Sequence, residues 1–199
     1  MKIYRISKSL GFHGSQFNID AFKLDYVGKG IDQNGPGIYF TSNESDASVY
    51  GPYIYHVKLN FKKYLTNKTK PNIKEIKKLI FHRLKINNIQ EIEKWNENDF
   101  YDSSLSDWGE SPLMALSTFI NSVIQYEVTA LNSFLEILIN LYKNDDKQFV
   151  EDMHNILGYD GVVIENNNQE KTRHYIVYNL QSIELVEKKK SKIKHNENI

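Results

Sequence analysis

The chain has 199 residues, which is enough for one domain with a hydrophobic core and some length left for an insertion. Its 25 basic residues balance its 25 acidic residues, so the overall charge draws the protein neither to nucleic acid nor to a membrane surface. Cysteine is absent, which excludes disulfides, thiolate catalysis and cysteine-ligated metals.

Apolar segments are short throughout the chain. The opening residues, MKIYRISKSLGFHGS, contain no apolar run of the kind that a signal peptide needs. No stretch reaches the length of apolar residues that a bilayer-spanning helix requires. We therefore expect a cytoplasmic protein that does not enter a membrane. The abundance of lysine, asparagine and isoleucine is typical of an AT-rich genome and indicates a bacterium or a phage.

The first sixty residues predict short strands and turns. KIYRIS at 2–7 and GIYFT at 37–41 are rich in β-branched and aromatic residues, and YIYHVKLNF at 53–61 alternates apolar and polar positions. Between the last two lies SNESDASVYG. There Ser42 or Asn43 is expected to cap a short helix.

The middle of the chain, from about residue 70 to 157, has helical periodicity. One helix is expected to begin at Pro112 after an N-cap at Ser111, with Leu113, Leu116, Ile120 and Val123 on its buried face. ALNSFLEILINLY is apolar on most sides, so we expect it to be the most buried helix. A further helix is expected to end at Gly158.

Strands return after this block. Residues 161–165 and 173–179, joined by a polar turn, predict a β-hairpin, and SIELVE predicts a last strand. The basic segment 188–199 is expected to be a disordered tail. Because strands precede and follow the helices, we expect a single α+β domain over 1–187, with the helices at about 70–157 as an insertion.

Three stretches could carry chemistry. In FHGSQF, Gly14 after His13 leaves backbone that a ligand can approach closely, although a lone histidine is more often a cap or surface residue. Tyr39 and Tyr50 lie eleven residues apart, a spacing that can bring two rings around a flat heteroaromatic group, although either alone is typical of a core tyrosine. In HYIVYN, His174 begins what should be an interior strand, where a side chain can face a cleft.

Taken in order, HGS, then GPGIYF with a tyrosine eleven positions on, then HYIVYN resemble the ADP-ribosyltransferase fold. The resemblance is to the His-Tyr-Glu branch, which includes poly(ADP-ribose) polymerases and diphtheria-like toxins. GYDGVVI is also similar to ADP-ribosyltransferase domains in phage polyvalent proteins. The match covers roughly residues 1–60 and 158–185. It implies a split β-sheet core with an NAD cleft and a helical insertion on one side.

The resemblance also implies roles for individual residues. His13 would hold the ribose next to nicotinamide, the Gly14 backbone would bind the nicotinamide amide, and Ser15 would lie near the adenosine ribose. Tyr39 would lie under the nicotinamide ring, and Tyr50 would be the second stacking ring. NAD would be the substrate.

His174 stands where the family has a glutamate, which is a departure from its pattern. Cleavage of the bond between nicotinamide and ribose develops positive charge on the sugar, and a carboxylate stabilises that charge in a dry site. A neutral imidazole accepts a hydrogen bond from the ribose 2′-hydroxyl but brings no negative charge. Glu170, Glu165 and Glu110 are candidate substitutes; for Glu170, a solvated turn residue is the alternative interpretation.

Members of this branch that lack the glutamate are typically mono-transferases or inactive. We therefore expect an enzyme that transfers one ADP-ribose from NAD to a macromolecular acceptor, protein or nucleic acid, and releases nicotinamide. A bacterial toxin or phage effector is the expected setting, with an antitoxin or inhibitor as a candidate partner. The alternatives are an inactive module that binds a partner through its helical block, and an NAD-consuming RNA 2′-phosphotransferase. The histidines show no metal-ligand spacing.

Overall fold

A computed structural model describes residues 6–28, 35–67, 72–127, 131–143, 145–165 and 172–190. The fold is α+β, as the order of the predicted elements indicated, with a mixed seven-stranded sheet and six α-helices in these residues. The strands are β1 (Ile6–Ser15), β2 (Ile38–Thr41), β3 (Tyr53–Phe61), β4 (Tyr64–Thr66), β5 (Gly161–Glu165), β6 (Arg173–Val177) and β7 (Ile183–Lys190).

The strand order is β4-β5-β6-β2-β1-β3-β7. Only β4 and β5 run parallel; the other neighbours are antiparallel, including the predicted hairpin of β5 and β6. This places β2, β6 and β1 in the interior of the sheet, although the segments that form them lie far apart in sequence. The candidate motifs are therefore carried by adjacent strands.

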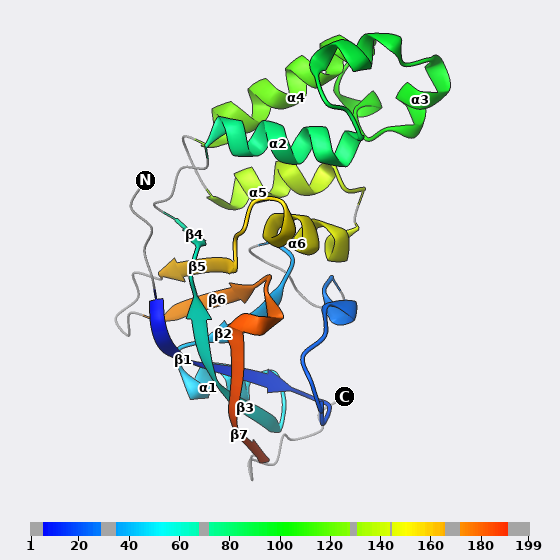
Figure 1. Cartoon of the computed structure of the whole chain (residues 1–199). Helices are drawn as coiled ribbons and strands as arrows, with labels where there is room; N and C mark the ends of the chain where they lie inside the picture. The colour runs from blue at the N-terminus through cyan, green and yellow to red at the C-terminus, as the bar shows by residue number, and fades with distance from the viewer. Residues whose placement is uncertain are drawn as a thin grey trace.

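The junction between β1 and β2 is the weakest in the sheet. A single register pair, Phe12 with Thr41, joins these strands, whereas β1 pairs with β3 along most of its length. In Figure 1, β5 and β6 run across the view, while β3 and β7 run down it, so the sheet changes direction around this junction. The strands thus form one hydrogen-bonded sheet rather than two separate ones, and its two halves diverge where β1 leaves β2.

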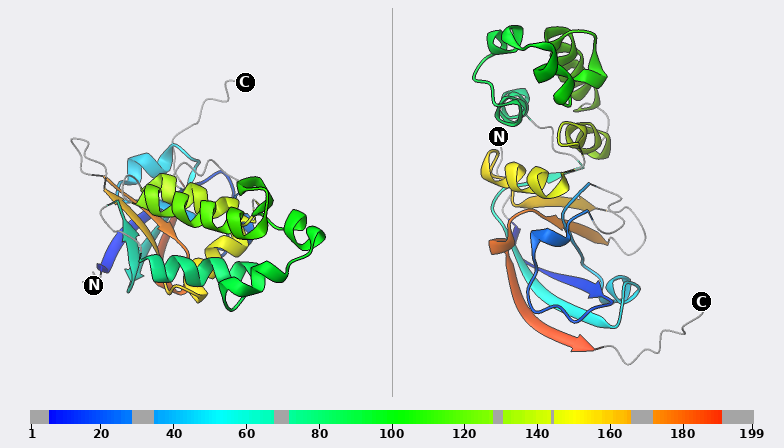
Figure 2. Two further views of the ribbon diagram at one scale, coloured as in Figure 1. Left: turned by 90° about the horizontal axis from the view of Figure 1, so that it is seen from above. Right: turned by 90° about the vertical axis from the view of Figure 1, so that its right-hand side faces the viewer.

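The helices are α1 (Glu44–Ser48), α2 (Ile73–Leu84), α3 (Glu97–Asp102), α4 (Pro112–Glu127), α5 (Leu131–Asn140) and α6 (Asp146–Asn155). Short 3₁₀ turns, η1 (Leu24–Tyr26), η2 (Ile89–Lys94), η3 (Ser106–Trp108) and η4 (Leu180–Ser182), connect several elements. All but α1 among the α-helices belong to the predicted helical block. Figure 2 shows this block stacked at one end of the sheet.

Local signals account for several helix ends. The Asn43 side chain accepts a hydrogen bond of 3.0 Å from the Ser45 backbone N–H, which caps α1 as predicted. The helix α4 begins at Pro112, also as predicted. Beyond α6, Gly158 has φ +75°, and its N–H donates to the His154 carbonyl, which ends the helix.

One hydrophobic core joins the helical block to the sheet. It includes Leu79 of α2, Phe119 of α4 and Phe149 of α6 together with Val162 and Ile176 of the sheet, all fully buried. The ring of Phe149 also meets that of Tyr178 edge-on. The block therefore contributes to the stability of the domain and is not an appendage on it.

Two details differ from the sequence-based expectations. The strand β7 continues to Lys190 by pairing with Tyr53 of β3, so it extends into the segment that was expected to be a disordered tail. Leu116 and Val123 are fully buried on α4 as expected, but Leu113 is 40% exposed, and Ala115 and Phe119 complete the buried face. The expected strand at 2–7 and the hairpin turn fall largely outside the described residues.

Candidate functional site

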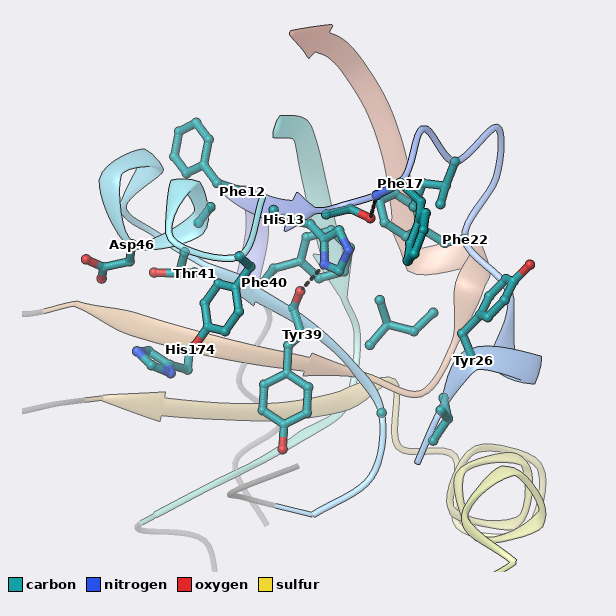
Figure 3. Close-up of a pocket in the computed structure, with 18 of the residues that line it drawn as sticks. Phe12, His13, Phe17, Phe22, Tyr26, Tyr39, Phe40, Thr41, Asp46 and His174 are labelled. Atoms are coloured by element: carbon teal, nitrogen blue, oxygen red, sulfur yellow. Dashed lines mark hydrogen bonds between the residues drawn. The ribbon is translucent and has the colours of Figure 1, made fainter. Parts of the chain in front are cut away.

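A cavity of about 670 Å³ opens where β1 and β2 diverge (Figure 3). Its walls come from four segments: the end of β1, the loop that follows it, β2 with α1, and the start of β6. The lining residues named by the sequence analysis are His13, Gly14, Ser15, Tyr39, Tyr50 and His174. The structure thus brings residues from all three candidate stretches to one cavity.

The His13 side chain bridges the two diverging strands. Its Nδ1 lies 2.8 Å from the Tyr39 carbonyl oxygen. Because a carbonyl only accepts hydrogen bonds, Nδ1 must carry the proton. Burial lowers the pKa of His13, and the bond to Tyr39 opposes that shift only in part, so the ring is neutral at pH 7. Its Nε2 is then a hydrogen-bond acceptor, turned away from Tyr39 in Figure 3.

Aromatic rings hold the His13 imidazole in place. Phe22 meets it edge-on with centroids 5.3 Å apart, and Phe40 lies 5.6 Å away. Phe22 belongs to the loop after β1, which is fixed by a 2.7 Å hydrogen bond from the Ile19 N–H to the Tyr55 hydroxyl. Sequence analysis missed this loop, because nothing local shows that residues 17–27 fold back over the strand end.

Gly14 is required by the close approach of α1. A Cβ at this position would overlap the carbonyl oxygen of Ala47, which is itself buried in α1. The absence of a side chain therefore lets the helix pack directly on β1. The neighbouring Ser15 lines the cavity and accepts a 3.1 Å hydrogen bond from the Phe17 N–H through its hydroxyl oxygen.

The two tyrosines have different environments. The Tyr39 ring is partly buried against the main core, and its hydroxyl donates a 2.5 Å hydrogen bond to the Gly35 carbonyl. Tyr50 is 65% exposed at the cavity rim. No ring contact between the two occurs in the part of the chain that the structure describes, so the slot between them is not closed by direct stacking.

His174 lies in the second position of β6, an interior strand, and lines the cavity. Its register partner on β2 is Thr41, and the next pair along that face of the sheet joins Tyr39 to Ile176. Ile176 is fully buried, whereas His174 is only partly buried at the open end of the strand. His174 therefore lies at the edge of the cavity, at the open end of the strand.

The candidate carboxylates are not gathered at His174. Glu165 lies across the hairpin, where its carboxylate is 3.1 Å from the Arg173 guanidinium, and it does not line the cavity. Glu110 is exposed just before α4, also away from the cavity. Glu170 lies outside the described residues.

Asp46 of α1 lines the cavity, and among the described lining residues it is the only carboxylate. Sequence analysis missed it. An acidic residue in the first turn of a helix is common because it complements the helix dipole, so its position gave no separate signal. Sequence analysis also missed Phe17 and Tyr26, two exposed aromatic residues at the cavity rim, because an isolated aromatic residue gives no separate signal either.

Over the ranges given above, no group of three or more histidine, aspartate or glutamate side chains is arranged to hold a metal ion. Within the same ranges, every helix is too short or too polar to cross a bilayer.

No protein-family model matches the chain, and no curated protein matches its sequence. Among solved structures, the chain is similar to one described as the crystal structure of an anti-CRISPR protein, with 13% identity and a TM-score of 0.33. That match covers 91% of this chain and 97% of the other. A TM-score this low supports neither a shared fold nor a shared function.

Proposed function

We propose that the chain is an NAD-dependent mono-ADP-ribosyltransferase that transfers ADP-ribose to a macromolecular acceptor and releases nicotinamide. One observation carries the proposal: three stretches that are distant in sequence, and that resemble the ordered motifs of this family, line one cavity. Its volume of about 670 Å³ lies within the range of about 300–1,000 Å³ that is usual for small-molecule sites.

The chemistry of His13 supports the same reading. A neutral imidazole with its proton fixed on Nδ1 offers Nε2 as an acceptor. A ribose hydroxyl can donate a hydrogen bond to this Nε2 atom. The surrounding rings, including Phe22 and Phe40, limit the movement of the imidazole and keep its acceptor in one direction.

His174 is assigned the place beside the ribose 2′-hydroxyl. It shares one cavity with His13, and the resemblance matches it to the position of the family's glutamate. An imidazole there can hold the sugar but supplies no negative charge. We therefore expect a slow enzyme limited to a single transfer, rather than one that builds polymers.

A second candidate is a catalytically inactive NAD-fold module that binds a partner through its helical block. The presence of histidine instead of a carboxylate at position 174 favours it. So does Tyr39, whose hydroxyl is already bound to the Gly35 carbonyl and whose ring packs on the core.

Incubation with NAD separates the two candidates. The transferase should release nicotinamide and, in a lysate of host cells, attach labelled ADP-ribose to an acceptor. Digestion of the labelled product with protease or nuclease then identifies the acceptor class. An inactive module would bind NAD in a calorimetric titration, or fail to bind it, without releasing nicotinamide. Absence of both binding and release would refute the proposed function.

A further inference from the structure

Building on the proposed function, we propose that Asp46 is the carboxylate that stabilises the ribosyl cation in this cavity. Of the described lining residues, Asp46 alone can bring a full negative charge to the substrate. His13 is neutral because burial lowers its pKa, and Lys23 carries positive charge. Because positive charge develops on the ribose during the reaction, a negatively charged group is needed in the cavity, and Asp46 is the carboxylate in its described lining.

The helix that carries Asp46 is anchored on the sheet. Ala47, the next residue, is only 1% exposed, and its carbonyl group lies directly over Gly14 of β1. Two residues before Asp46, Glu44 has its carboxylate 3.4 Å from the imidazole of His56 on β3. With the Asn43 cap described above, these contacts fix the backbone on both sides of Asp46. A carboxylate on a fixed element stabilises charge without first having to reorganise.

Hydrogen bonds between the segment before α1 and the start of β6 also bring Asp46 close to the end of the cavity that contains His174. Ser42, four residues before Asp46, donates its N–H to the Arg173 carbonyl at 2.9 Å and accepts the Arg173 N–H through its hydroxyl at 2.9 Å. Thr41 is the register partner of His174. In the view of Figure 3, Asp46, Thr41 and His174 lie on one side of the cavity, away from Phe22 and Tyr26. The two side chains therefore flank one end of the cavity, on neighbouring elements.

Asp46 and His174 have different roles in this proposal, because a carboxylate carries negative charge and a neutral imidazole does not. When the bond between the ribose C1′ and the nicotinamide nitrogen breaks, its electron pair goes to the pyridinium nitrogen, which leaves neutral nicotinamide and a cationic sugar. The Asp46 carboxylate stabilises that cation. The acceptor, or water, then forms a bond to C1′ and loses a proton to solvent. His174 holds the 2′-hydroxyl. Charge and hydrogen bonding, which one glutamate supplies in the family, are thus divided between two residues.

The test measures nicotinamide release from NAD at several NAD concentrations. Asp46→Asn removes the charge but keeps the size of the side chain. It should lower kcat by about 100-fold, as the loss of one preorganised electrostatic contact does, and leave KM within about threefold. Asp46→Glu restores the charge and should recover part of kcat. Asp20→Asn is the matched control, because Asp20 is an exposed carboxylate in the loop beside the cavity that does not line it; its kcat should equal that of the wild type.

Thermal unfolding of each variant establishes that it is folded, and Asp46→Ser replaces Asp46→Asn if the latter is not. The inference is overturned if the wild type releases nicotinamide and the folded Asp46 variant does so with the same kcat. In that case the proposed function stands. If the wild type neither binds NAD nor releases nicotinamide, the proposed function fails, and the role of Asp46 fails with it.

Discussion

The imidazole of His13 donates a hydrogen bond of 2.8 Å to the carbonyl oxygen of Tyr39, so the side chain of one motif holds the backbone of the next. The bond lies beside the single register pair that joins β1 to β2. It thus takes the place of the strand pairing that stops there. One residue both keeps the sheet together at its weakest junction and presents an acceptor to the cavity.

This relationship predicts a pH dependence of stability. The pKa of His13 is lowered by burial, so the unfolded chain binds a proton more readily than the folded one. The resulting stabilisation is complete above the ordinary histidine pKa of about 6.5 and is lost as the pH falls through the lower folded value. His13→Gln should remove this contribution. Urea unfolding at about pH 8 and about pH 5.5 should therefore show a smaller drop in the free energy of unfolding for the variant than for the wild type. An equal drop in both proteins would contradict the prediction.

Gly14→Ala should destabilise the protein by about 1–3 kcal/mol, because the added methyl group overlaps the Ala47 carbonyl oxygen and the backbone has to move. Gly11→Ala on the same strand is the matched control. Its methyl group would lie 3.0 Å from the Leu59 Cδ1 atom, the end of a side chain that can shift, so the cost should be smaller. Chemical denaturation of both variants measures the difference. Equal costs would mean that α1 does not press on Gly14.

Tyr50→Ala should weaken NAD binding by about three- to tenfold, the value of one stacked aromatic pair, without changing stability. Tyr50 is 65% exposed, so its removal leaves the core intact. Removal of Tyr39, which packs against the core, would disturb it. Tyr101 of α3 is 66% exposed and does not line the cavity, so Tyr101→Ala controls for the loss of an exposed tyrosine. Calorimetric titration with NAD compares the two. If both variants bind NAD like the wild type, Tyr50 is not a stacking residue.

His174→Ala should lower nicotinamide release by about 10- to 100-fold, the loss of one hydrogen bond in a dry site. His174→Glu places a carboxylate beside the 2′-hydroxyl and should retain or raise the rate. Rates are measured for the wild type and both variants between about pH 5.5 and 8.5. Coincident rates at every pH would show that His174 takes no part in the reaction.

Several elements could be predicted because their signals are local. The alternation of YIYHVKLNF predicts β3 over the residues that form it, since every second side chain contacts the core. Asn43 and Pro112 mark the starts of α1 and α4 through backbone groups only a few residues away. The order of the motifs was enough to name His13, Tyr39 and His174, which line one cavity.

The sequence by itself determined the α+β class, the extent of the helical block and part of the cavity lining, including His13, Tyr39 and His174, because periodicity, caps and motif order are carried by neighbouring residues. The tertiary structure decided the rest. Asp46 looks like an ordinary first-turn acid until α1 packs over Gly14 and brings it to the cavity. Only the tertiary contacts show that Phe40, itself a buried core residue, meets the His13 ring, and that Tyr39 packs against the same core. These outcomes depend on contacts between distant segments, and a linear pattern does not specify such contacts.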